Sequence, residues 1–216
     1  MGYRDVYDAW KADPEGWWME QAKAVHWDRF PEAARSDDGT IWFPDGLTNT
    51  CYNAVDRHVD AGHGTRAAII YDSPVTGTTR TITYAELQAQ CASLAGALKA
   101  RGVEAGDRVV IYMPMVPEAI VAMLACTRIG AIHSVVFGGF AASELATRID
   151  DAQPKAVLAG SCGIEPGRVV AYKPLLDAAI EQASHKPEFC VIFQREQGRA
   201  ELIPGRDVDW FDAQDG

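Results

Sequence analysis

The chain has 216 residues, of which 48% are hydrophobic, and a formal net charge of −10. This content favours a packed core over disorder, and the length allows one large or two modest domains. The acidic charge repels polyphosphate backbones, so we expect no nucleic-acid partner, although a locally cationic loop can still bind a small anion.

Nothing in the sequence predicts membrane insertion or a signal peptide. The longest apolar run, residues 119–126, is far shorter than the roughly 20 residues that span a bilayer. The N-terminus, "MGYRDVYDAWKADPEGWW", is charged and aromatic. We therefore predict a cytoplasmic protein with no membrane partner. The five cysteines are widely scattered and form no C-x-x-C pair, which argues against disulfides and zinc.

Residues 1–45 differ from the rest of the chain because they contain five of its six tryptophans and few regular apolar repeats. We interpret them as an N-terminal extension that packs on the body, residues 46–216. Tryptophan contributes a large buried area wherever chain lies on chain, so packing explains these rings without any chemistry.

The body is predicted to begin with a helix and a β-hairpin. Residues 48–62 fit a helix that is capped by Thr48 or Asn49 and ends at Gly62. Two β-branched runs then flank residues 74–78, which is the pattern of a hairpin. The "TGTT" inside this segment resembles part of a phosphate-binding loop, but no lysine and glycine follow at the required spacing, so we interpret it as a turn.

The middle of the chain alternates between strands and helices. Thr83 and Glu86 form a T-x-x-E capping box for a helix that Gly102 closes, and Pro117 opens a second helix. Strands are expected at 108–115, 131–137, 155–160 and 188–193, and further helices near 142–152 and 172–183. These strands are too apolar to have a solvated face, which predicts an α/β fold with a parallel sheet and helices on both faces. After residue 193 the alternation is lost.

Ligands of open parallel sheets collect outside the carboxyl ends of the strands, which selects residues 113–117, "FGGF" and "GIEPGRVVAYK". In "FGGF", Gly138 and Gly139 permit a sharp turn and a close approach of a ligand, and Phe137 offers a ring for stacking. The alternative is a tight turn over a packed phenylalanine.

The stretch "EPGR" combines a stiffened turn with a cation. Pro166 restrains the backbone, Gly167 allows an unusual backbone angle, and Arg168 presents a planar fork suited to a phosphate, with Lys173 nearby. The alternative is a solvated surface turn. His58 and His133 lack a carboxylate, thiol or hydroxyl constellation and are interpreted as structural, and no nucleophile elbow, carboxylate pair or metal-ligand cluster appears.

Residues 81–158, "TITYAELQAQC…DAQPKAVL", resemble the first part of the adenylate-forming acyl-CoA synthetases, in the acetyl-CoA and propionyl-CoA synthetase branch. "GLTNTCYNAVDRHV" and "GIEPGRVVAYKPLLDAAI" are most similar to propionyl-CoA synthetases. The resemblance covers nearly the whole chain to about Phe193, and residues 46–216 would be the first part of the AMP-binding large domain.

The resemblance implies a two-step ligase. A carboxylate and ATP give an acyl-adenylate and pyrophosphate, and the thiol of coenzyme A then displaces AMP. In relatives, the loop that corresponds to Glu165, Pro166, Gly167 and Arg168 holds the phosphate end of the coenzyme A nucleotide. The aromatic residue at Phe137 lies along the adenine, with Gly138 beside it.

At Glu165 the chain departs from acetyl-CoA synthetases, which have an arginine there. The loop therefore has one positive group fewer, and Lys173 or a residue beyond this chain would have to compensate.

The phosphate loop of the family, its metal-binding glutamate and its mobile-domain lysine would all lie downstream of residue 216. We therefore expect no catalytic residue and no metal ligand within this chain, no tightly bound cofactor, and no formation of acyl-adenylate by the chain alone. Its partners would be a short-chain carboxylate, ATP with Mg²⁺, coenzyme A and the rest of its own polypeptide. A stand-alone nucleotide-binding module without catalysis, or a structural domain that binds nothing, is the alternative.

Overall fold

The computed structural model describes residues 2–215, which divide into two compact units, one up to Ala54 and one from Val55 onward. The first unit contains the helices α1 (Tyr3–Ala12) and α2 (Pro14–Ala22). Asp13 caps α2 by accepting a hydrogen bond from the Gly16 amide at 3.0 Å. The predicted division at residue 45 and the packing of the extension on the body stay predictions.

Aromatic side chains pack on one another in the first unit, as the tryptophan content indicated. The ring of Trp18 meets the edge of Trp17 at a centroid distance of 4.7 Å and that of Trp42 at 5.1 Å. Trp27 lies 5.3 Å from Phe43 in a similar edge-on geometry. Such pairs stabilise a segment that has little regular secondary structure.

The predicted helix near residues 48–62 forms, but two of its segments are π-helical, η1 (Tyr52–Asp56) and η2 (Val59–His63). Asn49 supplies the expected cap, because its side-chain oxygen accepts from the Tyr52 amide at 3.0 Å. The predicted hairpin is confirmed as strands β1 (Ala67–Ser73) and β2 (Thr78–Thr83), which pair antiparallel. Gly77 has a φ of 63° in the connection, so the first half of "TGTT" lies in a turn, as predicted, and its last two threonines begin β2.

Helix α3 (Tyr84–Ala100) begins at the predicted capping box. The Glu86 carboxylate accepts from the Thr83 amide at 2.7 Å, and the Thr83 hydroxyl accepts from the Glu86 amide at 3.3 Å. Its apolar residues at helical spacing are all buried: Leu87, Cys91, Leu94 and Leu98.

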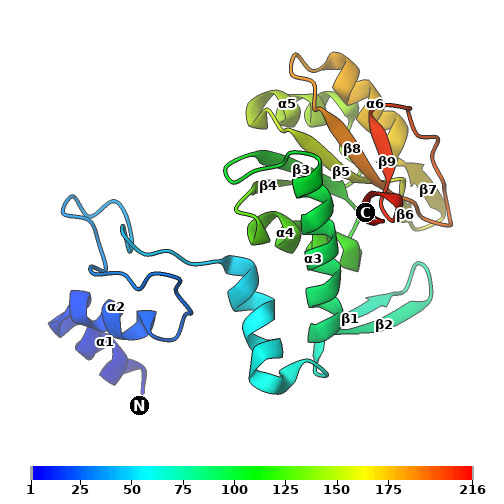
Figure 1. Ribbon diagram of the computed structural model, residues 1–216. Helices are drawn as coiled ribbons and strands as arrows, with labels where there is room; N and C mark the ends of the chain where they lie inside the picture. The colour runs from blue at the N-terminus through cyan, green and yellow to red at the C-terminus, as the bar shows by residue number, and fades with distance from the viewer. Residues whose placement is uncertain (1, 216) are drawn as a thin grey trace. The chain divides into compact units, whose positions relative to one another are not determined.

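The second unit is built on a parallel sheet of five strands in the order β4-β3-β5-β8-β9 (Figure 1). The strands of this sheet are β3 (Arg108–Met113), β4 (Ile132–Phe137), β5 (Ala156–Gly160), β8 (Phe189–Phe193) and β9 (Asp207–Asp209). The connecting helices are α4 (Pro117–Arg128), α5 (Ala142–Ala152) and α6 (Tyr172–Gln182), and a short 3-10 helix, η3 (Asp212–Gln214), follows β9.

Helices cover both faces of this sheet, which confirms the α/β prediction (Figure 1). On one face, Val110 and Val157 pack with Leu145 of α5 and Leu176 of α6 in a single buried cluster. Successive strand residues point to opposite faces, so neighbours such as Ile111 lie on the other face, which α4 covers with α3 packed against it.

Strand β4 differs from the expectation that every strand is buried on both faces. It is an edge strand that pairs only with β3 within the described residues. Ile132 and Val135 are each 55% exposed, and His133 is half-buried rather than enclosed. An apolar run therefore predicted the strand correctly but not its position at the edge.

The tail also differs from the sequence expectation, because it continues the sheet. Asp207 to Asp209 pair in parallel with β8, and Trp210 is buried directly after them. The strand has only three residues, two of them acidic, so it carries no apolar signal that sequence reading can detect.

A buried charge network fixes β9 to α6. The Lys173 ammonium lies 2.7 Å from a carboxylate oxygen of Asp177 and 2.9 Å from one of Asp207. Arg206 donates from Nε to Asp207 at 2.7 Å and also pairs with Asp177. The side chains of Lys173 and Asp207 are only 3% and 0% exposed, so each charge depends on its partners.

All five cysteines are free and buried, and burial raises the pKa of Cys126 and Cys190 to about 12. Among the described helices, none has both the length and the apolar content needed to cross a membrane.

The charge network predicts a pH-dependent stability. Burial alone would raise the pKa of Asp207, but hydrogen bonds from Arg206, the Ile203 amide and Lys173 outweigh burial and lower it below 3.8. A lowered pKa stabilises the fold above pH 3.8, and this contribution is lost as the pH falls through the folded-state pKa. We expect Asp207→Asn to reduce the free energy of unfolding at pH 7 by about 3–5 kcal/mol, since Asp177 alone would then face both Lys173 and Arg206 and one positive charge of the network would be uncompensated.

Urea unfolding of the parent and Asp207→Asn across pH 7 to 2 measures this difference, which should shrink below pH 3.8. Asp151→Asn, an exposed change on α5, is the matched control and should differ from the parent by less than about 0.5 kcal/mol. A difference that stays constant with pH would contradict the role of the Asp207 charge.

Candidate functional site

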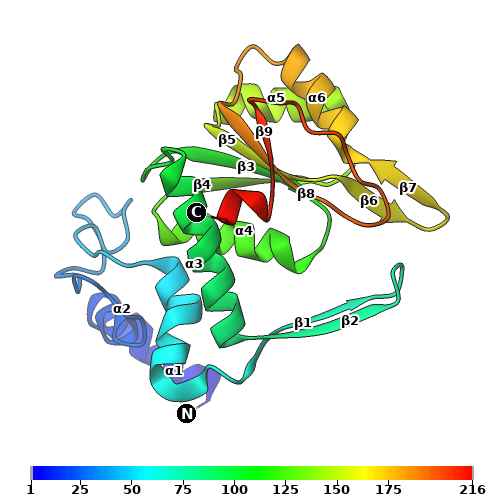
Figure 2. The same ribbon diagram turned by 45° about the vertical axis from the view of Figure 1, so that its right-hand side comes forward.

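The predicted loop at residues 163–173 is a β-hairpin followed by a helix. Strands β6 (Cys162–Glu165) and β7 (Arg168–Ala171) pair antiparallel, and α6 begins directly after them. Ile164, Val169 and Val170 favour extended backbone, which accounts for the hairpin. It leaves the carboxyl end of β5 and extends beyond the edge of the main sheet (Figure 2).

The turn of this hairpin is Pro166–Gly167, and Gly167 has a φ of 81°. A proline followed by a residue with positive φ is the pattern of a type II turn, for which glycine is the favoured second residue. The sequence-based prediction that Gly167 adopts an unusual backbone angle is therefore confirmed. The turn places Glu165 and Arg168 opposite each other.

Glu165 and Arg168 form an ion pair on the hairpin. Both Nε and one Nη of Arg168 contact the same carboxylate oxygen of Glu165, at 2.7 and 2.6 Å. The side chain of Arg168 is 69% exposed and that of Glu165 is 48% exposed, so the guanidinium remains accessible to solvent. Residues 164–169 and Val75 of the β1–β2 turn line a shallow hollow of about 410 Å³ beside this pair.

Lys173 does not add a cation to this hollow. The sequence suggested that it could compensate for the missing arginine at position 165. Its side chain is instead buried at the start of α6 and neutralised by Asp177 and Asp207. A lysine that neutralises buried carboxylates in this way is not available to an incoming anion, so the suggestion for Lys173 was wrong, and compensation by a residue beyond this chain stays a prediction.

Phe137 lies at the carboxyl end of β4 and is 73% exposed. Its ring centroid is 5.7 Å from that of Phe140, which is partly buried against the core cluster. The alternative of a turn over a packed phenylalanine therefore describes Phe140, not Phe137. An exposed aromatic ring at a strand end is available for stacking on a flat ligand.

Tyr172 connects the two predicted pieces of the site. A Cβ atom on Gly163 would lie 2.2 Å from its hydroxyl oxygen, and one on Gly138 would lie 2.8 Å from the same atom. Both glycines are therefore required for the backbone of β6 and the turn after β4 to approach one phenol ring. Burial raises the pKa of Tyr172, with a smaller contribution from the Glu165 charge.

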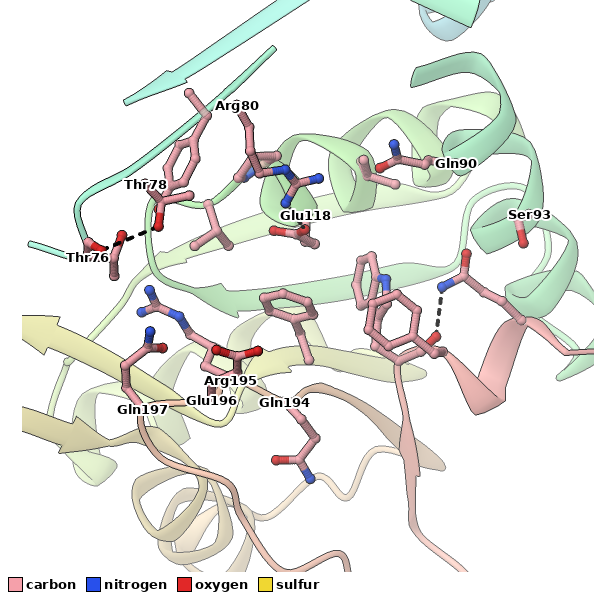
Figure 3. Close-up of a pocket in the computed structure, with 18 of the residues that line it drawn as sticks. Thr76, Thr78, Arg80, Gln90, Ser93, Glu118, Gln194, Arg195, Glu196 and Gln197 are labelled. Atoms are coloured by element: carbon pink, nitrogen blue, oxygen red, sulfur yellow. Dashed lines mark hydrogen bonds and ion pairs between the residues drawn. The ribbon is translucent and has the colours of Figure 1, made fainter. Parts of the chain in front are cut away.

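Sequence reasoning missed Tyr172. Its ring lies close to Gly138 and Gly163, which are 34 and nine positions before it in the chain, and no local pattern shows this contact. The stretch 113–117 selected from the sequence borders a cavity of about 700 Å³ at the carboxyl ends of β3 and β8, but the sequence did not indicate the other walls of this cavity. Figure 3 shows Arg80 and Glu118 on one side of this cavity and Arg195 and Glu196 on the other.

Val116 and Pro117 of the selected stretch 113–117 line this cavity, but no residue of "FGGF" or "GIEPGRVVAYK" does. Arg80 pairs with Glu118 at 3.4 Å, and Arg195 donates to the Cys162 carbonyl at 3.3 Å. Positively charged arginines, negatively charged carboxylates and aromatic rings all line this cavity. The mixture of charges does not indicate one class of ligand. The candidate site remains the region around the β6–β7 turn, because the guanidinium of Arg168 is exposed there and the backbone at Gly138, next to the exposed Phe137, approaches the same tyrosine ring as Gly163 of the hairpin.

The two histidines considered from the sequence have structural surroundings. The ring of His58 lies 4.9 Å from that of Tyr84, and burial lowers the pKa of His133. Over residues 2–215, no three His, Cys, Asp or Glu side chains gather in a way that could hold a metal ion.

The contact between Gly163 and Tyr172 predicts a strong coupling. Gly163→Ala forces the new methyl group onto the phenol ring, and we expect a loss of about 1–3 kcal/mol in the free energy of unfolding, as overpacked cores show. In a Tyr172→Ala background the ring is absent, so the same substitution should cost less than about 0.5 kcal/mol.

A double-mutant cycle by urea unfolding measures this coupling. Equal costs of Gly163→Ala in both backgrounds would show that the ring does not restrain the hairpin.

Comparison with known proteins follows the division of the fold. Residues 55–212 match the family described as AMP-binding enzyme, and residues 3–54 match the acetyl-coenzyme A synthetase N-terminus. The chain is 55% identical to an uncharacterized protein of Pseudomonas aeruginosa over 93% of its length. It is 50% identical to acyl-CoA synthetase short-chain family member 3, mitochondrial, of Rattus norvegicus, over 96%.

A third relative, the acetyl-coenzyme A synthetase of Xanthobacter autotrophicus, is 42% identical over 98% of the chain. The aligned regions cover 32%, 31% and 33% of these three relatives. The chain thus spans about a third of the length of the curated relatives it matches.

Proposed function

Because the chain belongs to the AMP-binding enzyme family, we propose that it forms the N-terminal part of a short-chain acid–CoA ligase. The complete enzyme would join a carboxylate to ATP, releasing pyrophosphate, and would then transfer the acyl group from AMP to the thiol of coenzyme A. The names of two relatives, a short-chain acyl-CoA synthetase and an acetyl-coenzyme A synthetase, support this reaction class.

We propose propionate as the preferred acid. Its support is the similarity of "GLTNTCYNAVDRHV" and "GIEPGRVVAYKPLLDAAI" to propionyl-CoA synthetases. The cytoplasmic location expected from the sequence stays a prediction. ATP with Mg²⁺ and coenzyme A would be substrates of the complete enzyme, and no catalytic residue is assigned within residues 1–216.

The role of this chain, we propose, is to hold the nucleotide end of coenzyme A. Arg168 would meet its ribose phosphate, because a guanidinium fork on a rigid turn matches the geometry of phosphate oxygens. Phe137 would stack along the adenine, with Gly138 allowing close approach. Glu165, Pro166 and Gly167 complete the turn. The observation that carries this proposal is the exposed guanidinium of Arg168 at the carboxyl edge of the sheet.

The phosphate contact is tested by comparing coenzyme A with dephospho-coenzyme A, which lacks the ribose phosphate. We expect Arg168→Ala to weaken coenzyme A binding by about five- to tenfold and to leave dephospho-coenzyme A unchanged, since only the charge-assisted contact is removed. NMR-detected titration reads the weak affinities expected for this chain.

Arg148→Ala removes an exposed arginine of α5 and is the matched control. Equal weakening for both ligands, or none, would exclude a phosphate contact at Arg168. A chain that binds coenzyme A but whose longer polypeptide has no ligase activity would favour the alternative, a binding module without catalysis.

The reaction is tested on the polypeptide that carries this chain at the length of its relatives. Acid-dependent AMP formation should be fastest with propionate when acetate, propionate and butyrate are compared. The 216-residue chain alone should release no pyrophosphate above background, because the resemblance locates the adenylation residues elsewhere. Acid-dependent pyrophosphate release by this chain would overturn the assignment of catalysis to another region.

A further inference from the structure

The exposed guanidinium of the candidate site already has an anionic partner. Glu165 and Arg168 are directly opposite each other across the two-residue turn, so their side chains extend from the same side of the hairpin. Nε and one Nη of Arg168 both contact Oε2 of Glu165, at 2.7 and 2.6 Å. The pair therefore uses one edge of the guanidinium fork.

That edge is one of those a phosphate would use. A guanidinium has five N–H donors in a fixed fork and binds carboxylates and phosphates through the same pairs of donors. A ligand phosphate must displace the Glu165 carboxylate, or bind the remaining donors with that carboxylate close by. In both cases the glutamate opposes the phosphate, through competition for donors or through repulsion of like charge.

No second cation lines this hollow within the described structure. Arg168 is the only basic residue among those that line the hollow of residues 164–169 and Val75. Lys173, the next basic residue along the chain, is buried between Asp177 and Asp207. The charge balance at the turn therefore depends on Glu165 and Arg168 themselves.

From these contacts we infer that Glu165 is a specificity-determining residue that competes with the ligand phosphate for Arg168 and so limits the preference for a 3′-phosphorylated nucleotide carrier. The inference rests on the proposed function, because it assumes that the hollow receives a phosphate-bearing ligand. Arg168 attracts the phosphate, and Glu165 lowers the affinity that Arg168 alone would give.

The size of the effect follows from the exposure of the pair. Both side chains are partly solvated, at 69% and 48%, and exposed ion pairs change an equilibrium constant by up to about fivefold. We expect Glu165→Gln, which keeps the size of the side chain and removes its charge, to strengthen coenzyme A binding by about three- to fivefold. Binding of dephospho-coenzyme A should stay unchanged, so the ratio of the two affinities rises by the same factor.

A charge series on the same position sharpens the experiment. Glu165→Gln, Glu165→Asp and Glu165→Arg are titrated with coenzyme A and dephospho-coenzyme A by NMR, with unfolding midpoints measured for each variant. Aspartate keeps the charge and should retain the parent ratio within about twofold, whereas arginine should raise it more than glutamine does, by about tenfold or more. Chemical shifts of the Arg168 Nε–H report directly whether the ligand displaces the glutamate.

Each outcome separates the two proposals. If Arg168→Ala lowers coenzyme A binding but Glu165→Gln leaves the affinity ratio unchanged, the competition is disproved and the phosphate site stands. If neither Arg168→Ala nor any Glu165 variant changes coenzyme A binding, both proposals fail. A rise of equal size for both ligands in Glu165→Gln would show a general loosening of the hairpin and would overturn the inference.

Discussion

The phenol ring of Tyr172 fixes the geometry of the candidate site, because two separate backbone segments depend on the same space around it. Gly138 follows strand β4 and Gly163 lies in strand β6, and each would meet the ring with any larger side chain. The ring is held in turn by the core, where it lies 5.0 Å from Tyr112 of β3. The distance between the turn after β4 and the β6–β7 hairpin is therefore set by the position of Tyr172 against the sheet.

The parallel sheet explains why these residues meet at all. All five strands run in the same direction, so the segments that follow β3, β4, β5 and β8 leave at one edge. Phe137 is the last residue of β4 and Glu165 follows β5, and the cavity near Arg80 and Glu118 lies at the same edge. Residues that are far apart in the sequence therefore lie at the same edge of the sheet, because the parallel arrangement of the strands brings their carboxyl ends together.

Local signals made much of this fold predictable from the sequence. Thr83 and Glu86 announce a helix start through hydrogen bonds that involve only neighbouring residues, and the structure contains both bonds. The positions of the apolar strands and the family of the chain were identified correctly for the same reason, because each depends on continuous stretches of sequence. The role of Lys173 was not predictable, because its partner Asp207 is 34 positions away and belongs to a strand too short and too acidic to recognise. The ion pair at Arg168 involves neighbours in the turn, yet a hairpin register had to be known before Glu165 could be placed opposite it.

The closed environment of the native cysteines makes this chain a suitable background for spectroscopic probes. All five sulfur atoms are shielded from solvent, and the thiols of Cys126 and Cys190 stay protonated far above neutral pH. Alkylating dyes react with thiolates, so they should not react with Cys126 or Cys190 in the folded protein. A single cysteine engineered at a solvated position would then carry a fluorophore or spin label selectively, without first removing the natural sulfhydryl groups.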